Sequence, residues 1–305
     1  MEGENKRYID PMVDAAFKRI FGSEINKDLL IAFLNEIFQG RRYIIDLVYN
    51  KNEYPGEIAM EGGAIYDLTC TDQNGAQFLI EVQRGRQKYF KHRAIFYMSR
   101  LITSQAPKGR RKEWGYALSA VYLIAILDHP INNGTAENYI HDVCLIDKNT
   151  KEIFYEELGY IIIDLCSFVK TEEELDGDLD RWLYLIKHLS KLDEMPETFN
   201  NPIFKRLLAV SEYSNLTQKE KIMYDRSMKY KWDNKNVLDF AVNEGMEKGL
   251  AQGMDKGVEL GKIQGNLEGR SEALAIVALK MKMQGYSVEI IQGLTHLSLA
   301  EIEQL

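Results

Sequence analysis

The sequence has few of the residues that hold small secreted and zinc-binding proteins together. It contains three cysteines, Cys70, Cys144 and Cys166, and five histidines in 305 residues, and neither set has the spacing of a metal site. We therefore expect no disulfide framework, and the apolar or strand-like surroundings of the cysteines favour reduced, buried thiols. The scattered histidines also offer no Ser-His or Cys-His arrangement for nucleophilic catalysis.

A membrane-spanning segment is also missing. The longest apolar run, residues 117–127, is too short to cross a bilayer and is typical of a central buried strand. The first ten residues carry charges where a signal peptide has its apolar stretch. With an ordinary hydrophobic content of 45%, the chain is expected to be a cytoplasmic protein with no membrane partner.

Acidic residues are absent from residues 84–112, although the whole chain has a formal net charge of -8. A basic segment in an acidic chain predicts a surface for a polyanion such as DNA. The simpler alternative is a solvated helix face followed by a loop. The candidate DNA contacts in this segment are Arg84, Arg86, Lys88, Lys91, Arg93 and Arg100.

Two carboxylates stand next to the basic segment, on two strand-like stretches joined by a turn. The stretches are residues 65–71 and 77–84, and they contain Asp67 and Glu81. Because side chains alternate along a strand, Glu81 and Gln83 point to the same face. The spacing alone occurs often by chance, and surface acids on a hairpin are the simpler interpretation.

These residues have the ligand types that Mg²⁺ prefers, since a hard cation binds oxygen atoms and keeps waters for a phosphate substrate. The expected ligands are Asp67, Glu81 and the backbone carbonyl of Val82. A two-residue loop between the strands would place Asp67 opposite Val82. A three-residue loop closed by Asp72 places Asp67 opposite Glu81 instead. The metal site therefore requires the three-residue loop.

Four segments of the sequence together carry a family resemblance. They are DAAFKRIFG from Asp14 to Gly22, LLIAFLNEIF, IEVQ from Ile80 to Gln83, and RAIFYMSRLITSQ. In combination they resemble the Rpn family of recombination-promoting nucleases, also described as transposases, within the PD-(D/E)XK nuclease superfamily. The resemblance covers most of the chain, including its C-terminal end.

The resemblance implies a restriction-endonuclease-like α/β fold, with a mixed sheet flanked by helices and an all-helical C-terminal part. It implies metal-dependent DNA cleavage, in which a metal-activated water attacks the phosphorus in line, with Mg²⁺ as the cofactor and Mn²⁺ as a substitute. Asp67 matches the first acid of the family motif and Glu81 matches the second. Asp14 matches the acid on the family's first helix, although Asp14 and Lys18 are four residues apart and also suit a surface ion pair.

Gln83 stands where the superfamily more often has lysine. A lysine can hold positive charge on the attacked phosphate or orient the water, whereas glutamine is neutral and can only form hydrogen bonds. We expect Gln83 to position the water or the phosphate. Arg84, Arg86 and Lys18 are alternative sources of the missing charge.

The pattern along the chain predicts a nuclease core at residues 1–166, an acidic helical region at 167–244, a helical glycine repeat at 245–270 and a helical tail at 271–305. Within the core, helices are expected near residues 10–38 and 87–104. Strands other than the hairpin are expected near residues 43–49, 117–127, 139–146 and 160–165. Capping signals predict helix starts at Thr171, Thr217, Ser287 and Ser298, and a separate helix is expected at residues 271–284.

Seven glycines recur at intervals of four residues: Gly245, Gly249, Gly253, Gly257, Gly261, Gly265 and Gly269. Glycine inside a helix costs about 1 kcal/mol relative to alanine, so either a compensating contact or disorder is expected here. Apolar residues repeat beside the glycines, which predicts close approach of a second helix and a homo-oligomer through residues 245–269. A glycine-rich phosphate loop is the poorer alternative, because the spacing matches neither a P-loop nor a dinucleotide fingerprint.

The function expected from these observations is a metal-dependent DNA endonuclease of the recombination-promoting or transposase-associated type. The alternative is a catalytically weak or inactive nuclease fold that serves as a DNA-binding or oligomeric assembly module. Metal binding at Asp67 and Glu81 separates the two, because the basic segment suits either one. Strand joining by a complete transposase is a third interpretation, which no residue demonstrates.

Overall fold

The computed structural model describes residues 7–50, 53–54, 64–65, 67–106, 115–131 and 138–305 of the chain. The chain divides into two compact units, Met1–Tyr230 and Lys231–Leu305. The sheet belongs to the first unit, and the described residues of the second unit are helices and short connections.

A mixed six-stranded sheet forms the centre of the first unit. In spatial order its strands are β1 (Leu47–Tyr49), β4 (Leu68–Asp72), β5 (Gln77–Gln83), β6 (Val121–Leu127), β8 (Ile153–Asp164) and β7 (Ile140–Ile146). The three strands β5, β6 and β8 are parallel, and the other neighbouring pairs are antiparallel. A separate two-stranded sheet joins β2 (Glu53–Tyr54) and β3 (Ala64–Ile65).

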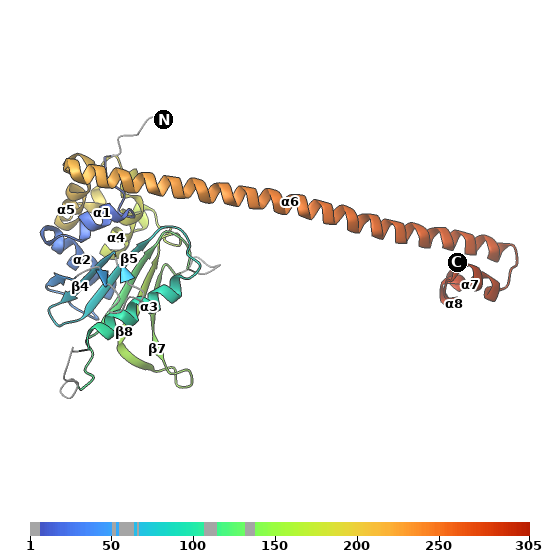
Figure 1. Ribbon diagram of the computed structural model, residues 1–305, viewed down its shortest axis with the longest axis horizontal. Helices are drawn as coiled ribbons and strands as arrows, with labels where there is room; N and C mark the ends of the chain where they lie inside the picture. Colours follow the sequence, from blue (N-terminus) through green and yellow to red (C-terminus); the bar gives the residue numbers. More distant parts are fainter. Residues whose placement is uncertain (1–6, 51–52, 55–63, 66, 107–114, 132–137) are drawn as a thin grey trace. The chain divides into compact units, whose positions relative to one another are not determined.

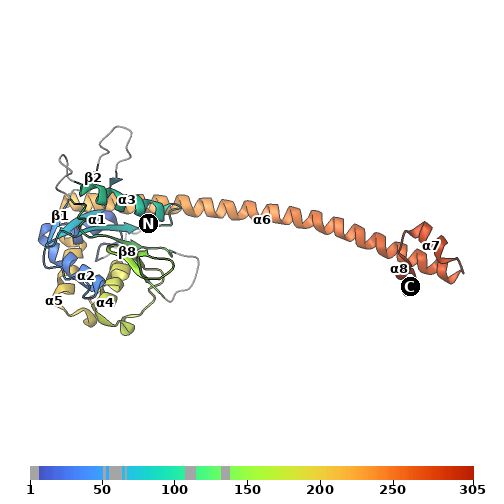
Figure 2. The same cartoon turned by 90° about the horizontal axis from the view of Figure 1, so that it is seen from below.

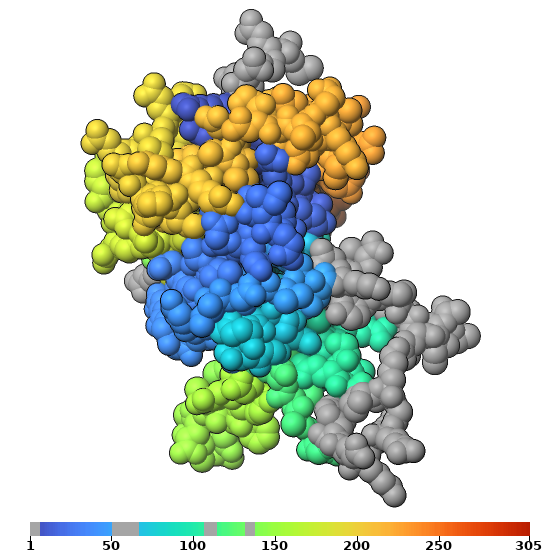
Figure 3. Space-filling model, turned by 90° about the vertical axis from the view of Figure 1, so that its left-hand side faces the viewer, coloured from blue at the N-terminus to red at the C-terminus, as the bar shows by residue number. Residues whose placement is uncertain are grey.

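Helices cover both faces of the sheet, and Figure 2 shows the sheet between α3 and the group of α2, α4 and α5. The helices of the first face are α1 (Asp14–Phe21), α2 (Lys27–Phe38), α4 (Gly177–His188) and α5 (Pro202–Ser211), and the second face has α3 (Phe90–Ser104). Short 3₁₀ turns lie at Glu24–Asn26, Glu172–Glu174, Leu189–Lys191, Glu197–Phe199 and Tyr213–Asn215. Figure 3 shows the blue N-terminal residues against the yellow segment that contains α5.

The alternation of side chains along β5 divides the hydrophobic core in two. Phe78 and Ile80 pack on the side of α1 and α2, where Phe33 and Trp182 are also buried. Leu79 packs on the opposite side, against α3. Because residues two apart share a face, the side chains that follow Leu79 at positions 81 and 83 are directed to the α3 side of the sheet. This places the acidic and amide groups of β5 beneath the basic helix.

The expected α/β architecture, a mixed sheet flanked by helices, is confirmed, and several element boundaries are corrected. The helix expected at residues 10–38 is two helices, because α1 ends at Gly22, whose N–H donates to the Lys18 carbonyl at 2.8 Å. A Cβ at Gly22 would come within 2.7 Å of that oxygen, so the sequence uses glycine where the chain turns. The strand expected at residues 65–71 is divided as well, since Ile65 pairs with Glu53 in the small sheet.

Three other strands begin at positions different from those expected, among them the strand expected from residue 43, which begins at Leu47. The strand expected from residue 117 begins at Val121. The strand expected from residue 160 begins at Ile153, because its first half pairs with β7 beyond the helix-covered part of the sheet. Most residues of that half are exposed, so they lack the hydrophobic pattern of a buried strand. Thr171 caps a 3₁₀ turn, and α4 itself begins at Gly177.

A single long helix, α6 (Gln218–Met283), contains all seven glycines of the repeat (Figure 1). Its start after the Thr217–Glu220 capping box is as expected, with Thr217 Oγ1 donating to Glu220 at 2.7 Å. Residues 271–284 do not form a separate helix. Two short helices follow, α7 (Val288–Thr295) and α8 (Leu299–Gln304), and the expected caps at Ser287 and Ser298 are confirmed. Ala278, Ile291 and Ile302 form a small core among these elements.

The cysteines differ from expectation in one respect. Cys70 is buried, whereas Cys144 and Cys166 are exposed, and all three are free thiols. None of the helices in the described ranges combines the length and the hydrophobicity needed to cross a membrane.

Candidate active site

The connection between β4 and β5 sets the position of the two candidate carboxylates. Asp72 donates its backbone N–H to the carbonyl of Ala76 at 2.9 Å, which closes a three-residue loop. The β4–β5 ladder runs in the register that, continued by one residue, pairs Asp67 with Glu81. The odd-length loop required by the metal hypothesis is therefore confirmed, and the two carboxylates occupy opposite positions on one face.

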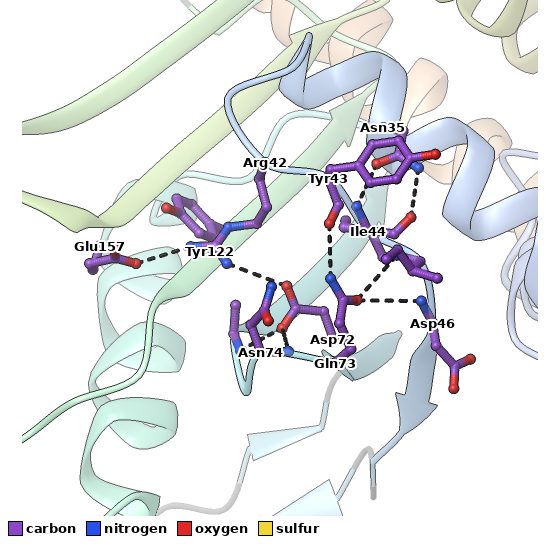
Figure 4. Close-up of polar contacts among 12 residues, drawn as sticks. Asn35, Arg42, Tyr43, Ile44, Asp46, Asp72, Gln73, Asn74, Tyr122 and Glu157 are labelled. Carbon is purple, nitrogen blue, oxygen red and sulfur yellow. Dashed lines mark hydrogen bonds and ion pairs between the residues drawn. The ribbon is translucent and has the colours of Figure 1, made fainter.

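The side chain of Asp72 holds this loop in place (Figure 4). It is fully buried and accepts hydrogen bonds at 2.9 Å from the backbone N–H groups of Asn74 and Ala76. Its second oxygen faces Arg42 at 3.3 Å, and Arg42 also binds Glu157 at 3.0 Å. The register of the candidate site thus depends on an ion pair with a residue thirty positions earlier in the chain.

Gln73 supplies a second attachment for the same loop, also visible in Figure 4. Its amide donates to the carbonyl of Tyr43 at 2.9 Å and accepts from the N–H of Ile45 at 3.1 Å. The segment that Gln73 binds is itself fixed to α2, because the side chain of Asn35 exchanges two hydrogen bonds with the backbone of Ile44. The hairpin is therefore anchored to the helical layer at its turn.

Replacing Asp72 with alanine is expected to lower the free energy of unfolding by about 3 kcal/mol. The change leaves two backbone donors without their acceptor in a buried site and removes one of the two carboxylate partners of Arg42. Urea denaturation followed by circular dichroism measures the loss. Asp147→Ala is the matched control, because Asp147 also accepts from two turn amides, of Asn149 and Thr150, but is exposed. A cost no larger than that of the control would contradict the assigned role.

The two carboxylates lie in a partly desolvated site. Glu81 is only 7% exposed, and its Oε1 is buried with no hydrogen-bond partner among the described residues. Asp67 is less buried, and its Oδ2 accepts the N–H of Val82 at 2.8 Å. Burial, followed by the neighbouring charge of Asp67, raises the pKa of Glu81 to about 8. Burial also raises the pKa of Asp67, and the charge of Asp14 acts in the same direction.

The donor set suits a divalent cation. A buried carboxylate oxygen without a partner is costly unless a cation or a proton compensates it, and a second carboxylate faces it. Val82 directs its N–H towards Asp67, and the N–H and C=O of one strand residue point to the same side, so its carbonyl oxygen is directed to this edge as well. In the described parts of the chain, no three His, Cys, Asp or Glu residues gather closely enough to hold a metal. Two carboxylates, one carbonyl and waters are the set that Mg²⁺ accepts.

Asp14 lies at the edge of this site. It forms an ion pair with Lys18 at 2.8 Å on α1, with both side chains about half exposed, so the surface pairing suggested by the spacing is present. The two charges nevertheless act on the candidate site, since Asp14 raises the pKa of Asp67 and Lys18 lowers it. These opposing effects make the pair a peripheral electrostatic contributor.

Gln83 is buried and bound to a residue that the sequence indicated only as a DNA contact. Its Oε1 accepts from Arg93 Nη2 at 2.6 Å, and its Nε2 donates to the carbonyl of Gly85 at 3.2 Å. The expected role, positioning of water or phosphate by the amide, would therefore be exercised together with Arg93. The arginine lies ten residues further along the chain, at the start of α3. This spacing did not indicate in the sequence that the two side chains pair.

Arg84, a candidate for both DNA contact and charge supply, is engaged inside the fold. Its Nε donates to the carbonyl of Met12 at 2.9 Å, and its guanidinium forms an ion pair with Asp10. Asp10 is in turn fixed through its N–H, which donates to Tyr224 Oη at 2.9 Å. Arg84 thus joins the N-terminal segment to the end of β5.

Three of the other candidate DNA contacts, Arg86, Lys88 and Lys91, lie near the carboxyl ends of β5 and β6, whereas Arg100 lies on α3 with its guanidinium carbon 5.6 Å from the centre of the Phe96 ring. A cavity of about 350 Å³ lies at these strand ends, and none of the described residues that line it is acidic. Its basic and imidazole-bearing residues are Arg86, Lys88, Lys91, His92 and His129. The Nδ1 atom of His129 is buried and has no hydrogen-bond partner among the described residues. The carboxyl edge of parallel strands is a common ligand position in α/β folds, and this cavity has the charge to accept phosphate groups.

Comparison with known protein families identifies a match over most of the chain. A family model described as PD-(D/E)XK nuclease family transposase matches residues 11–241. Neither the curated proteins nor the solved structures include a match to this chain. The matched range contains the whole sheet, the carboxylate pair and the basic helix.

Proposed function

The chain belongs to the PD-(D/E)XK nuclease family of transposases, and on this basis we propose that it is an endonuclease that hydrolyses DNA phosphodiester bonds with Mg²⁺ or Mn²⁺ held at Asp67 and Glu81. The observation that carries the proposal is the buried, partnerless Oε1 of Glu81 opposite Asp67. Two facing, partly buried carboxylates disfavour each other's ionised form, which raises their pKa values, whereas a cation bound between them would stabilise both charges.

The residues of the site would have separate roles in this reaction. Asp67, Glu81 and the Val82 carbonyl would bind the cation, and because the pKa of Glu81 is raised to about 8, its carboxyl group would lose a proton when the cation binds. The bound ion supplies activation of water and neutralises charge on the phosphate. The cavity containing Lys88 and Lys91 would bind the DNA strand beyond the cleaved bond.

The proposal is tested by nicking of supercoiled plasmid with Mg²⁺, with Mn²⁺ and with chelator, using protein purified in parallel with Asp67→Asn. Cleavage that needs the metal and is lost in the variant supports the nuclease. Equal cleavage by both proteins would identify a contaminant. Retained DNA binding with no cleavage under any metal condition would favour the alternative, an inactive fold that serves as a DNA-binding or assembly module.

We also propose a cytoplasmic, recombination-promoting or transposase-associated role and self-association through residues 245–269. Free cysteines support the cytoplasmic location. Self-association is supported by the glycines of α6, since a Cβ built at Gly253 meets nothing within 4 Å, while the neighbouring Leu250 and Met254 are 66% and 64% exposed. A second copy of the same helix would cover this stripe.

Gly253→Leu is expected to shift the protein towards monomer in light scattering measured over a range of concentrations. The larger side chain blocks close helix approach, although it improves the helix propensity of the single chain. Gln252→Leu, which adds a leucine beside the stripe, is the matched control and should leave the association unchanged. A wild-type protein that is monomeric at every concentration would exclude the proposed contact.

A further inference from the structure

The position where the superfamily more often has lysine holds a neutral residue in this chain, yet a positive charge lies beside it. Arg93 Nη2 is 2.6 Å from Gln83 Oε1, and its Nη1 donates to the side-chain oxygen of Gln87. The guanidinium carbon lies 5.8 Å from the centre of the Tyr97 ring. Three neighbouring side chains therefore hold the guanidinium on the α3 side of β5, the side to which Glu81 also belongs.

Among the described residues, Arg93 has no charged hydrogen-bond partner. Both hydrogen-bond acceptors are neutral amides, and together they engage two of the five N–H groups of a guanidinium. Two of the three other cations suggested for this role, Arg84 and Lys18, have carboxylate partners. Arg84 is paired with Asp10, and Lys18 is paired with Asp14 at 2.8 Å.

The charge of Arg93 reaches both carboxylates. It lowers the pKa of Glu81, where it is the largest of the effects that oppose burial, and it lowers the pKa of Asp67 as well. Burial raises the pKa of Tyr97, and the charge of Arg93 opposes this shift as well. Arg93, hydrogen-bonded to Gln83, stabilises the ionised carboxylates. Its charge is therefore close enough to act on a phosphate bound at the same site.

We propose that Arg93 contacts the phosphate under attack and supplies the positive charge that lysine supplies elsewhere in the superfamily, with Gln83 as the positioning residue that holds it. The inference rests on the proposed function. In the hydrolysis one water forms the new P–O bond and one ester P–O bond breaks, giving a phosphate monoester and a hydroxyl group. Arg93 stays protonated throughout and donates N–H groups to the non-bridging oxygens as their charge increases.

The test compares single-turnover cleavage rates and DNA affinity in variants of the full chain. Arg93→Gln is expected to reduce the cleavage rate constant by about 100-fold, the typical cost of removing one charge-stabilising donor. Adding Gln83→Lys to Arg93→Gln is expected to recover at least about tenfold of the loss, since it restores the charge at the superfamily position. Arg226→Gln, at an exposed arginine outside the site, is the charge-matched control.

Mn²⁺ binding measured by calorimetry separates the loss of a catalytic charge from a structural defect, because a structural defect would also weaken Mn²⁺ binding. Arg93→Gln should bind Mn²⁺ at least as tightly as wild type, because a cation has been removed from beside the carboxylates. Should Arg93→Gln fail to fold, Arg93→Lys takes its place, with a cleavage rate expected between those of wild type and a charge-free site because lysine lacks the planar fork.

The possible failures are distinguishable. If wild type does not cleave DNA, the proposed function fails and the inference fails with it. If wild type cleaves and Arg93→Gln keeps its rate constant while only DNA affinity falls, Arg93 is a strand contact and the inference is overturned, although the nuclease stands. If Gln83→Lys recovers no activity in the double variant, the hypothesis that Arg93 replaces the charge of the superfamily lysine is rejected.

Discussion

Glu81→Gln is expected to lower metal-dependent DNA cleavage by about 1,000-fold or more. The substitution keeps the volume of the side chain but removes the anionic oxygen at the centre of the proposed metal site, and the loss of even one electrostatic contact to a transition state costs roughly 100- to 1,000-fold. The measurement is the rate of nicking of supercoiled plasmid at saturating enzyme. DNA binding, measured in parallel by anisotropy, should be retained, since the basic cavity is unchanged.

Two further variants serve as controls for the effect of Glu81→Gln on cleavage. Glu156→Gln, at an exposed glutamate of β8, changes the net charge equally and should cleave as wild type. Asp14→Asn should have a much smaller effect than Glu81→Gln, because Asp14 is about half exposed and paired with Lys18. Activity of Glu81→Gln close to that of wild type would show that the carboxylate pair does not hold the catalytic metal.

The sequence was sufficient to identify the carboxylate hairpin but not its register. The turn contains Asn74 and Gly75, which suit a two-residue loop as well as a three-residue one. The three-residue loop is stabilised by the buried pair of Asp72 with Arg42, and Arg42 lies before β1. A contact between positions that far apart cannot be derived from local turn preferences. An aspartate at the start of a turn was the available signal.

The glycine repeat shows a second limit of local reasoning. Each glycine is unfavourable in a helix, so the sequence left disorder open as an alternative to a contact that compensates the glycines, yet α6 runs through all seven without a break. The residues between the glycines are mostly strong helix formers, such as Met246, Lys248, Leu250 and Glu259, and they provide the local preference that the glycines lack. The helix propensity summed over the whole segment, and not that of single glycines, determines whether the segment is helical.

Arg93 illustrates what the sequence could indicate only in part. Its charge placed it among the DNA contacts, and helical spacing placed it on the basic helix. Its position over Gln83 depends on how α3 packs on the sheet, through the contacts of Met98 and Leu101 in the core shared with Leu79. That packing is a tertiary property, so the pairing of a neutral amide on β5 with an arginine on α3 appears only in the folded chain.

The second large effect expected of Glu81→Gln is an increase in the stability of the metal-free protein by about 2 kcal/mol near pH 7.5. The folded state holds the pKa of Glu81 near 8, above its usual value, mainly because burial disfavours the charge. Above the ordinary glutamate pKa the unfolded chain releases this proton while the folded chain keeps it, so wild-type stability falls as pH rises from about 4.5 to about 8. Glutamine carries no charge at any pH and removes this loss.

Chemical denaturation of the metal-free protein at a series of pH values measures both quantities. Wild type should lose stability over that pH range, and Glu81→Gln should show a flatter profile. Adding Mn²⁺ at neutral pH should then raise the stability of wild type, by about 2.7 kcal/mol at a hundredfold excess over the dissociation constant, and leave Glu81→Gln nearly unchanged. The order of stability would reverse between metal-free and metal-loaded conditions. A buried carboxylate without a partner destabilises the metal-free protein and stabilises the protein once a cation binds to it. If Glu81→Gln were less stable than wild type without metal, the Glu81 carboxylate would instead have a structural partner.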